Sequence, residues 1–154
     1  MSVIQTVEEI EAIYGEPGNE SLVKVSDNIT PEYRNWIASS SFCALATVGP
    51  EGVDASPRGD AGEVVFELDA KTLAMPDRRG NNRLDTLRNI VEDPRVGLLF
   101  LIPGLNETLR LNGRAHVTTN KRLLQSFAID GRHPATVVVI EIDTLYFQCA
   151  RALK

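Results

Sequence analysis

The stretch MPDRRGNNRLDTLRNIVEDPRVGLLF, residues 75–100, holds the signals that decide the fold. It opens at the end of an apolar segment and turns at Gly80. Apolar residues then recur at helical spacing over Arg83–Val91, and Pro94 prevents much continuation of that helix. The apolar run 95–102 follows, with the composition of a strand buried on both faces. The stretch therefore predicts strand, turn, helix and strand in close succession.

Further strands are expected on both sides of this stretch. Their composition is apolar or β-branched and turn residues bound them; they are Phe42–Val48, Val53–Pro57, Val64–Leu68, Thr72–Met75, Thr108–Thr118 and Thr136–Ile142, with Tyr146–Cys149 extending or following the last. Gly113 predicts a bulge in the longest strand. Six or seven strands joined mostly by hairpin-length turns predict a mainly β protein, with an antiparallel, closed or nearly closed barrel and peripheral helices.

Two helices are expected before the first strand. Thr6 and Glu9 fit a capping box for a helix that ends at Gly15, and Thr30 precedes Pro31 at the start of a second helix. We therefore divide the chain into an N-terminal helix and loop extension, 1–28, and a barrel domain, 29–154. The first helix is expected to pack on the barrel or on a partner subunit.

The overall composition excludes several classes of function. The chain has 154 residues and a formal net charge of −5, which argues against nucleic-acid binding. No apolar run approaches the roughly 18–20 residues that span a bilayer, so no membrane partner is expected. The acidic N-terminus lacks the pattern of a signal peptide. Cys43 and Cys149 lie in apolar runs, which is typical of reduced thiols, and a cytoplasmic location is expected.

Hydrolytic and metal-dependent chemistry has no candidate residues in the sequence. His116 and His133 are solitary, and neither they nor the cysteines have zinc-site spacing. Phosphate-binding P-loops, dinucleotide fingerprints and nucleophile elbows are also absent from the sequence. We therefore predict no catalytic side chain and no metal ligand.

The remaining chemistry-bearing residues are arginines in three places. Arg58 ends the second strand, a cluster lies within residues 75–83, and Arg110 shares one face of a strand with Thr108, Asn112 and Arg114. A solvent-facing surface would have the same pattern on that last strand, so both interpretations stay open for it.

The cluster within residues 75–83 is more informative. We expect Asn81 or Asn82 to cap the helix that follows, whose free N–H groups favour an anion such as phosphate. Arg78, Arg79 and Arg83 oppose the helix dipole there, and a bound anion would resolve that conflict. The alternative is a solvated helix start in which nearby aspartates, Asp77 and Asp85, pair with these arginines.

The order of these motifs resembles one family. Ser-Pro-Arg-Gly-Asp, then Pro-Asp-Arg-Arg-Gly-Asn-Asn-Arg, then Asp-Pro-Arg-Val-Gly-Leu-Leu-Phe and Glu-Thr-Leu-Arg-Leu-Asn-Gly-Arg-Ala are similar to the pyridoxamine 5′-phosphate oxidase-like flavoproteins, the FMN-binding split barrels. The resemblance is strongest to a bacterial subgroup of unassigned substrate. It implies a six- to seven-stranded antiparallel split β-barrel and a homodimer with two FMN sites at the subunit interface.

The resemblance also implies the residues of the FMN site. Arg58 matches a basic position near the phosphate or flavin ring, and Thr108 stands where glutamine is common. The strand end beside the ring is Met75, Pro76 and Asp77, the phosphate contacts are Asn82 and Arg83 with Arg79 beside them, and Arg110 is a second candidate, with Arg58, to stabilise charge on the reduced ring. The implied activity is an FMN-dependent oxidoreduction of unknown substrate, with NAD(P)H as an electron donor to test.

Two alternatives remain at this point. One is a non-catalytic flavin-binding or storage protein. The other is a different cofactor in the same barrel: F420 calls for a broad basic groove, and haem needs an axial ligand, for which the sequence offers only His116 and His133.

Overall fold

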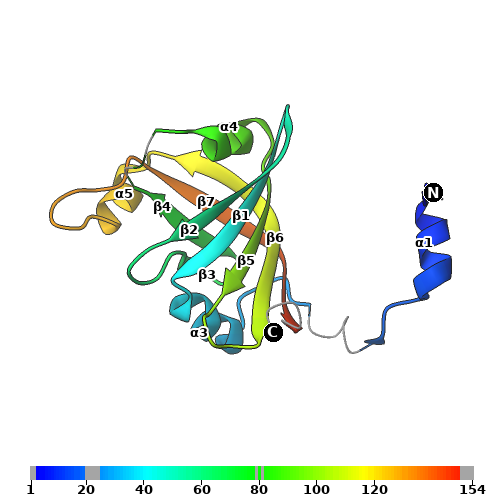
Figure 1. Cartoon of the computed structure of the whole chain (residues 1–154). Helices are drawn as coiled ribbons and strands as arrows, with labels where there is room; N and C mark the ends of the chain where they lie inside the picture. The colour runs from blue at the N-terminus through cyan, green and yellow to red at the C-terminus, as the bar shows by residue number, and fades with distance from the viewer. Residues whose placement is uncertain (1–2, 20–24, 79, 81, 150–154) are drawn as a thin grey trace.

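The computed structural model describes residues 3–19, 25–78, 80 and 82–149, and the seven strands in these ranges form one antiparallel sheet that curls into a barrel (Figure 1). The strands are β1 (Phe42–Gly49), β2 (Gly52–Gly59), β3 (Phe66–Asp69), β4 (Thr72–Asp77), β5 (Arg95–Leu101), β6 (Glu107–Thr118) and β7 (Thr136–Cys149). Their order in the sheet is β2-β1-β5-β6-β7-β4-β3. The predicted mainly β, antiparallel split-barrel architecture is confirmed.

The barrel interior is built from alternating residues of the long strands. Burial alternates along β1, β5 and β6, because successive side chains of a strand point to opposite faces. Leu45, Leu98 and Leu111 share one cross-strand row, since Leu45 pairs with Leu98 and Leu98 pairs with Leu111. All three are buried, and the row lies at the centre of the main core.

The barrel is split where the two edge strands of the sheet meet without pairing. The order of the sheet leaves β2 at one edge and β3 at the other. Side chains close this split: Arg58 of β2 donates to Asp77 of β4 at 3.2 Å. Val64 and Val65 are buried in the connection between β2 and β3, because β3 begins at Phe66 and not at Val64 as predicted.

The bulge predicted at Gly113 is present, and its cause lies in the partner strand. The register between β6 and β7 shifts between Asn112 and Gly113, which leaves Asp143 of β7 as the extra residue. A Cβ at Gly113 would collide with the carbonyl oxygen of Glu141. Glycine therefore allows β6 and β7 to stay in contact through the shift.

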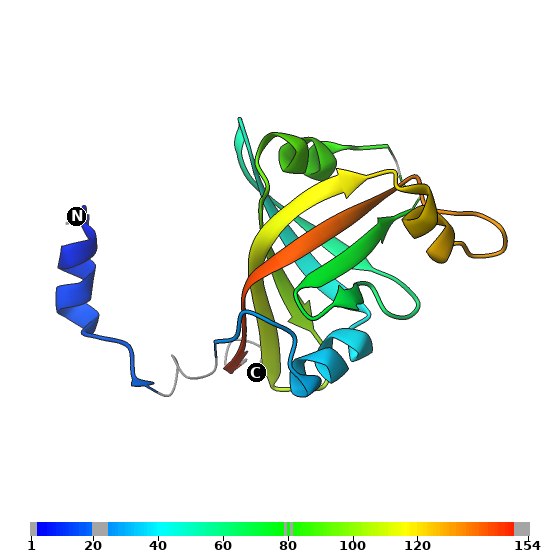
Figure 2. The same cartoon turned by 180° about the vertical axis from the view of Figure 1, so that it is seen from behind.

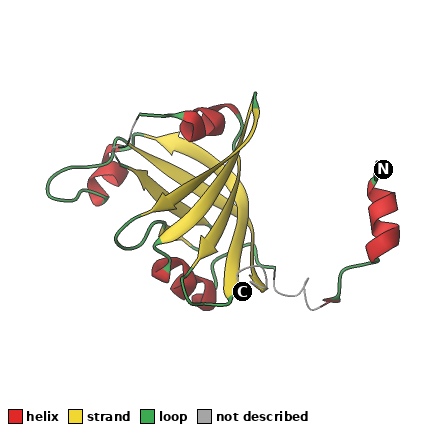
Figure 3. Ribbon diagram, viewed as in Figure 1, coloured by secondary structure: helices red, strands yellow, loops and turns green. Residues whose placement is uncertain are grey.

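Two helices pack directly on the barrel, one from each side (Figure 3). The first is α3 (Pro31–Ser39), whose predicted cap Thr30 accepts a hydrogen bond from the Tyr33 N–H. The second is α4 (Asp85–Glu92), which contacts β1, β2 and β6. A shorter helix, α5 (Lys121–Ser126), begins after the predicted cap Asn120 and precedes β7. Figure 2 shows α5 beside the ends of β4 and β6.

The N-terminal helix stands apart from the barrel of its own chain. α1 (Val7–Tyr14) has the predicted bounds and the predicted Thr6 cap, yet none of its residues is buried. Figures 1 and 2 both show it separated from the sheet. Packing on the barrel of the same chain was therefore a wrong expectation, and packing on a partner stays a prediction. None of the described helices is long and apolar enough to cross a bilayer.

Candidate functional site

A cavity of about 320 Å³ opens at the split, where β2 and β4 end. Its lining consists of Pro57, Arg58, Gly59, Asp60, Val64, Met75, Pro76, Asp77 and Arg78. The structure therefore brings together four of the nine cofactor-site residues predicted from the sequence: Arg58, Met75, Pro76 and Asp77. The connection that carries Val64 and the end of β4 form its apolar parts.

A chain of polar contacts runs along this cavity from α4 to β4. The hydroxyls of Thr86 and Ser56 lie 3.3 Å apart, and the Arg58 Nε donates to Ser56 Oγ at 3.3 Å. The Arg58 Nη1 then donates to Asp77 Oδ1 at 3.2 Å. Arginine stays charged at any pH that the fold tolerates. Three elements that are distant in sequence thus hold one half-buried guanidinium at the split.

Cys43 lies directly across from Arg58 in the sheet and is inert as a nucleophile. The two residues are partners in the β1–β2 register, and Cys43 is fully buried. Burial raises the pKa of the Cys43 thiol to about 12, and the nearby charge of Arg58 lowers it only in part. Because the thiolate is the reactive form, this thiol contributes packing and no covalent chemistry.

The predicted phosphate contacts lie just before α4, and the helix starts later than expected. α4 begins at Asp85, its cap is Leu84, and no side chain bonds to the cap position. The prediction of an Asn82 cap was wrong: Asn82 is exposed with φ 57°. The left-handed conformation suits asparagine and redirects the chain before the helix, so it does not serve as a cap.

Arg83 pairs with an aspartate, as the alternative interpretation of a solvated helix start predicts. Its Nε lies 2.6 Å from Asp85 Oδ2, and the Arg83 side chain is 79% exposed. The hydrogen bond that Arg83 donates to Asp85 raises the pKa of Arg83. Asp77, by contrast, pairs with Arg58. Arg79 and the other predicted cap, Asn81, lie outside the described residues.

Thr108 and Arg110 do not line the cavity in a single chain. Thr108 pairs with Gln148 near the end of β7, whereas Asp77 pairs with Thr136 at its start. Across the sheet, however, Arg58 pairs with Cys43, Cys43 with Phe100 and Phe100 with Leu109, so three strand spacings, roughly 14 Å, separate Arg58 from the residue between Thr108 and Arg110. Thr108 is buried and donates to the Gln148 carbonyl at 3.1 Å; Arg110 donates to Gln148 Oε1 at 2.8 Å and lies 5.2 Å from the centre of the Tyr146 ring.

The sequence reasoning missed several residues at the split. Arg78 was recognised as one arginine of the cluster, yet it was not assigned to the site that it lines. Its Nε is buried without a hydrogen-bond partner, as is the Thr136 hydroxyl, which belongs to the strand partner of Asp77. The signal for Arg78 was its place directly after β4. Ser56 and Thr86 gave no sequence signal, because their contact depends on how α4 sits on the barrel.

The two histidines stay outside this cavity. His116 is exposed on β6, and the His133 Nδ1 donates to the Pro134 carbonyl at 2.8 Å. No group of three or more metal-binding side chains occurs in the described parts of the chain.

Comparison with known proteins gives a family and a fold. A sequence profile described as pyridoxamine 5′-phosphate oxidase matches residues 29–149. No curated protein sequence matches significantly. A structure from Lactobacillus delbrueckii, provisionally named a pyridoxamine 5′-phosphate oxidase, has a TM-score of 0.64 at 19% identity and covers 80% of this chain and 98% of its own.

Two further solved structures have the same fold. HupZ from Group A Streptococcus has a TM-score of 0.63 at 19% identity, covering 79% of this chain and 95% of that one. A pyridoxamine 5′-phosphate oxidase-related, FMN binding protein from Nostoc punctiforme has a TM-score of 0.53 at 14% identity, covering 72% and 75%. At these identities the likeness establishes the arrangement of the strands and not the ligand.

Proposed function

Because the chain belongs to the pyridoxamine 5′-phosphate oxidase family, we propose that it binds FMN at the split of the barrel and acts as an FMN-dependent oxidoreductase of unassigned substrate. When bound, the flavin supplies the redox chemistry by accepting and passing on a hydride or electrons. The protein's part is to hold and orient the cofactor and to set the charge around it.

The guanidinium of Arg58 at the split is the observation that carries the proposal. Ser56 and Asp77 hold it from two sides, which leaves other guanidinium N–H groups available to a ligand in the cavity. A held cation beside an apolar wall that includes Met75 and Val64 suits a flat ring that gains negative charge on reduction. The Arg78 Nε, which lies 3.7 Å from Asp60 Oδ2, and the Thr136 hydroxyl make no hydrogen bond and are further polar atoms at this place.

The phosphate is assigned to the segment before α4. Asn82 and Arg83 are exposed there, and Arg79 belongs to the same proposed group by sequence alone. The Arg83–Asp85 pair is solvent-exposed, and such pairs contribute little free energy. A doubly charged phosphate is a stronger partner for Arg83 than the exposed carboxylate of Asp85.

The proposed assembly is a homodimer, because one chain supplies only part of the predicted site. A cavity of about 320 Å³ is at the lower end of ligand-pocket sizes, and Thr108 and Arg110 do not line it. The outward side of β1 and β5 carries small or apolar residues, Ala44, Ala46, Gly97 and Leu99, and is only half exposed. A second copy packed there would bring its own residues to the first copy's split.

The first experiment is the visible absorption spectrum of the purified protein, followed by titration with FMN and with riboflavin, which lacks the phosphate. FMN is expected to bind, with riboflavin at least about tenfold weaker because the arginine–phosphate contacts are lost. Sedimentation analysis then measures whether the protein is a dimer in solution. A colourless protein that binds neither flavin would overturn the proposal. Anaerobic mixing of the FMN complex with NADPH and with NADH tests for reduction of the flavin. If neither nucleotide bleaches the flavin absorption, the protein binds flavin without reductase activity.

A further inference from the structure

Two hydroxyl groups connect α4 to Arg58, and neither of them lines the cavity at the split. Thr86 lies in the first turn of α4 and is only 6% exposed, and Ser56 is half-buried on β2. Their oxygens are 3.3 Å apart, and Ser56 Oγ accepts a hydrogen bond from the Arg58 Nε at 3.3 Å. Because the cavity is lined by Arg58 and not by these hydroxyls, they can affect a ligand there only through Arg58.

Thr86 is the fixed end of this series of contacts. Its side chain is buried and β-branched and lies on a helix, which restricts its rotation about χ1. The helix itself is held on the barrel by a second threonine, because the Asn89 Nδ2 of α4 donates to Thr47 Oγ1 of β1 at 3.0 Å. A Cβ at Gly49 of β1 would collide with the Asn89 side chain, so the two elements are in close contact. The docking of α4 therefore sets the position of the Thr86 hydroxyl.

Ser56 is the adaptable link between Thr86 and Arg58. An unbranched serine side chain has three staggered rotamers to choose from. The contact with Thr86 selects the rotamer that also meets the Arg58 Nε. Arginine has donors only, so the Ser56 oxygen must be the acceptor in that contact. Without the Thr86 hydroxyl, Ser56 is free to rotate and Arg58 loses a fixed acceptor.

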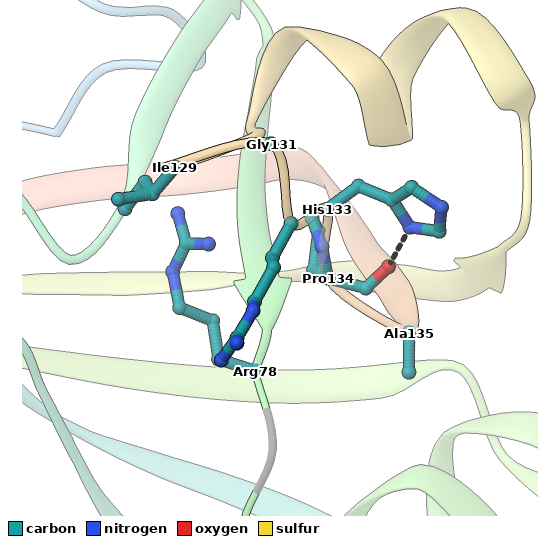
Figure 4. Close-up of a pocket in the computed structure, with 7 residues that line it drawn as sticks. Arg78, Ile129, Gly131, His133, Pro134 and Ala135 are labelled. Carbon is teal, nitrogen blue, oxygen red and sulfur yellow. Dashed lines mark hydrogen bonds between the residues drawn. The ribbon is translucent and has the colours of Figure 1, made fainter.

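The other side of the Arg58 guanidinium is held at the end of β4. Its Nη1 donates to Asp77 Oδ1 at 3.2 Å, and the Asp77 carbonyl accepts the Ala135 N–H at 3.2 Å. Figure 4 shows Arg78 at the end of this strand and Ala135 on the loop that leads into β7. Two nitrogens of one planar, rigid guanidinium are thus fixed by different elements, which sets its direction. Within the described part of the chain no group accepts from Nη2, which leaves this nitrogen to a ligand.

We infer that Thr86 is a positioning residue for Arg58: through Ser56 it fixes the direction in which the guanidinium faces the cavity at the split. The consequence for the flavin rests on the proposed function. A cation that is already held in place stabilises developing negative charge better than one that must first reorient. Thr86 therefore raises the affinity for reduced FMN relative to oxidised FMN, although it does not line the cavity.

The first test needs no flavin and uses the full chain. Exchange of the Arg58 Nε–H with solvent is measured by NMR in Thr86→Val, which keeps the branched side chain and removes the hydroxyl. The exchange rate is expected to rise by about fivefold or more, because the Nε loses its fixed acceptor. Thr86→Ser keeps the hydroxyl and is expected to exchange as the parent does. Parent-like exchange in Thr86→Val, or equally fast exchange in Thr86→Ser, would overturn the inference.

Thr47→Val is the matched control. Thr47 is also a buried threonine whose hydroxyl binds α4, but its partner is Asn89 and it has no contact with Arg58. The variant is expected to lower the free energy of unfolding and to leave the exchange of the Arg58 Nε–H unchanged. If it speeds exchange as much as Thr86→Val does, loosening of α4 alone releases Arg58, and the role assigned to the Thr86 hydroxyl is overturned.

Ser56→Ala tests the route from Thr86 to Arg58. It is expected to speed exchange at least as much as Thr86→Val does. The double variant Ser56→Ala/Thr86→Val is expected to exchange no faster than Ser56→Ala, because both changes remove the same connection. A further fivefold rise in the double variant would mean that Thr86 acts on Arg58 by another route, which would overturn the inference.

Titration with oxidised and with reduced FMN measures the consequence for the flavin. Thr86→Val is expected to lower the preference for reduced FMN by about fivefold, a fall of about 20 mV in the two-electron potential. Thr86→Ser is expected to restore the preference. In an Arg58→Gln background, Thr86→Val is expected to change nothing further, because Thr86 acts through Arg58.

The outcomes separate this inference from the proposed function. Exchange that depends on Thr86 in a protein that binds no FMN supports the positioning role and refutes the flavin proposal. FMN binding with parent-like exchange in Thr86→Val does the reverse. Faster exchange with an unchanged preference for reduced FMN would mean that Arg58 does not face the flavin ring, and the consequence drawn for the flavin would be overturned.

Discussion

Two short helices close the barrel, and they contact it with different chemistry. α3 packs through Tyr33 and Ile37, and both Tyr33 and the neighbouring Trp36 meet the ring of Phe147 edge-on, with centroids 4.9 and 5.0 Å apart. α4 buries Ile90 as well, but it also contributes Thr86 to the polar contacts that reach Arg58 and Asp77. The packing of α3 is mainly apolar and stabilises the fold, although the Trp36 Nε1 is buried there without a hydrogen-bond partner. Polar contacts at a split leave donors that a ligand can use.

This contrast predicts that stability and ligand binding separate between the two helices. Changes on the α3 side are expected to alter the free energy of unfolding and to leave flavin affinity nearly unchanged. Changes near α4 are expected to alter affinity more than stability. The variants that follow test this separation, and each has a counterpart on the other side or at a solvent-exposed position.

The largest effect is expected for Ile37→Ala on α3. Ile37 is 2% exposed, and removing a buried isoleucine side chain to Ala costs about 2–5 kcal/mol in the free energy of unfolding. Urea denaturation measures this loss. Ile13→Ala on α1, where the side chain is 65% exposed, is the control and is expected to change stability by less than about 0.5 kcal/mol. If Ile37→Ala lowers the FMN affinity of the folded protein as strongly as it lowers the stability, the contrast between α3 and α4 is wrong.

The next effect is expected for Arg83→Ala, just before α4. Loss of a charge-assisted contact to the flavin phosphate should weaken FMN binding by about 1.5–3 kcal/mol, measured by flavin titration. Stability should change little, because the Arg83 side chain is 79% exposed. Arg88→Ala, at an exposed arginine within the same helix, is the matched control. Equal FMN affinity in Arg83→Ala and the parent would remove Arg83 from the proposed site.

The fold was predictable because its signals are local. Alternating apolar residues and hairpin-length turns indicated each strand, and Thr30 with Pro31 indicated the start of α3. The errors fall where tertiary contacts decide. Val64 and Val65 have strand composition, yet they are buried in a connection that closes the split. Asn82 is a residue type that often caps helices, but here it takes a left-handed conformation two residues before the actual cap, Leu84.

The site was predictable only in part, for a similar reason. Four of the residues named from the motif resemblance line one cavity, because Arg58 lies at the end of β2 and Met75–Asp77 form the end of β4. The resemblance also named Thr108 and Arg110, which do not line this cavity in a single chain. Sequence motifs do not record which residues come from which subunit. The network through Thr86 and Ser56 could not be read from sequence, because it joins side chains 30 positions apart.

A smaller effect is expected from the ion pairs on the two sides. Asp77→Asn removes the charge opposite the half-buried Arg58 and is expected to cost about 1–2 kcal/mol of unfolding free energy. Glu67→Gln removes the partner of Arg34 on α3, where the arginine side chain is 47% exposed, and is expected to cost less than about 1 kcal/mol. Thermal denaturation of both variants at low salt measures the difference. Equal costs would mean that Arg58 is as well solvated as Arg34. The polar contacts at the split would then contribute no more to stability than an exposed ion pair.

The smallest effect is a pH dependence that reports how well the barrel is closed beside Arg58. Cys43 is buried there, and burial raises its pKa from 9.0 to about 12. Above the unfolded pKa the unfolded chain loses this proton while the folded chain keeps it, so stability is fully present below pH 9 and falls as the pH rises, by at most about 1.4 kcal/mol per pH unit. Cys43→Ala removes this contribution. Urea denaturation between pH 8 and 9.5 should therefore show the parent losing roughly 0.8 kcal/mol of its stability advantage over Cys43→Ala. A constant difference would mean that the thiol ionises equally in both states, and water would then have to reach the barrel interior beside Arg58.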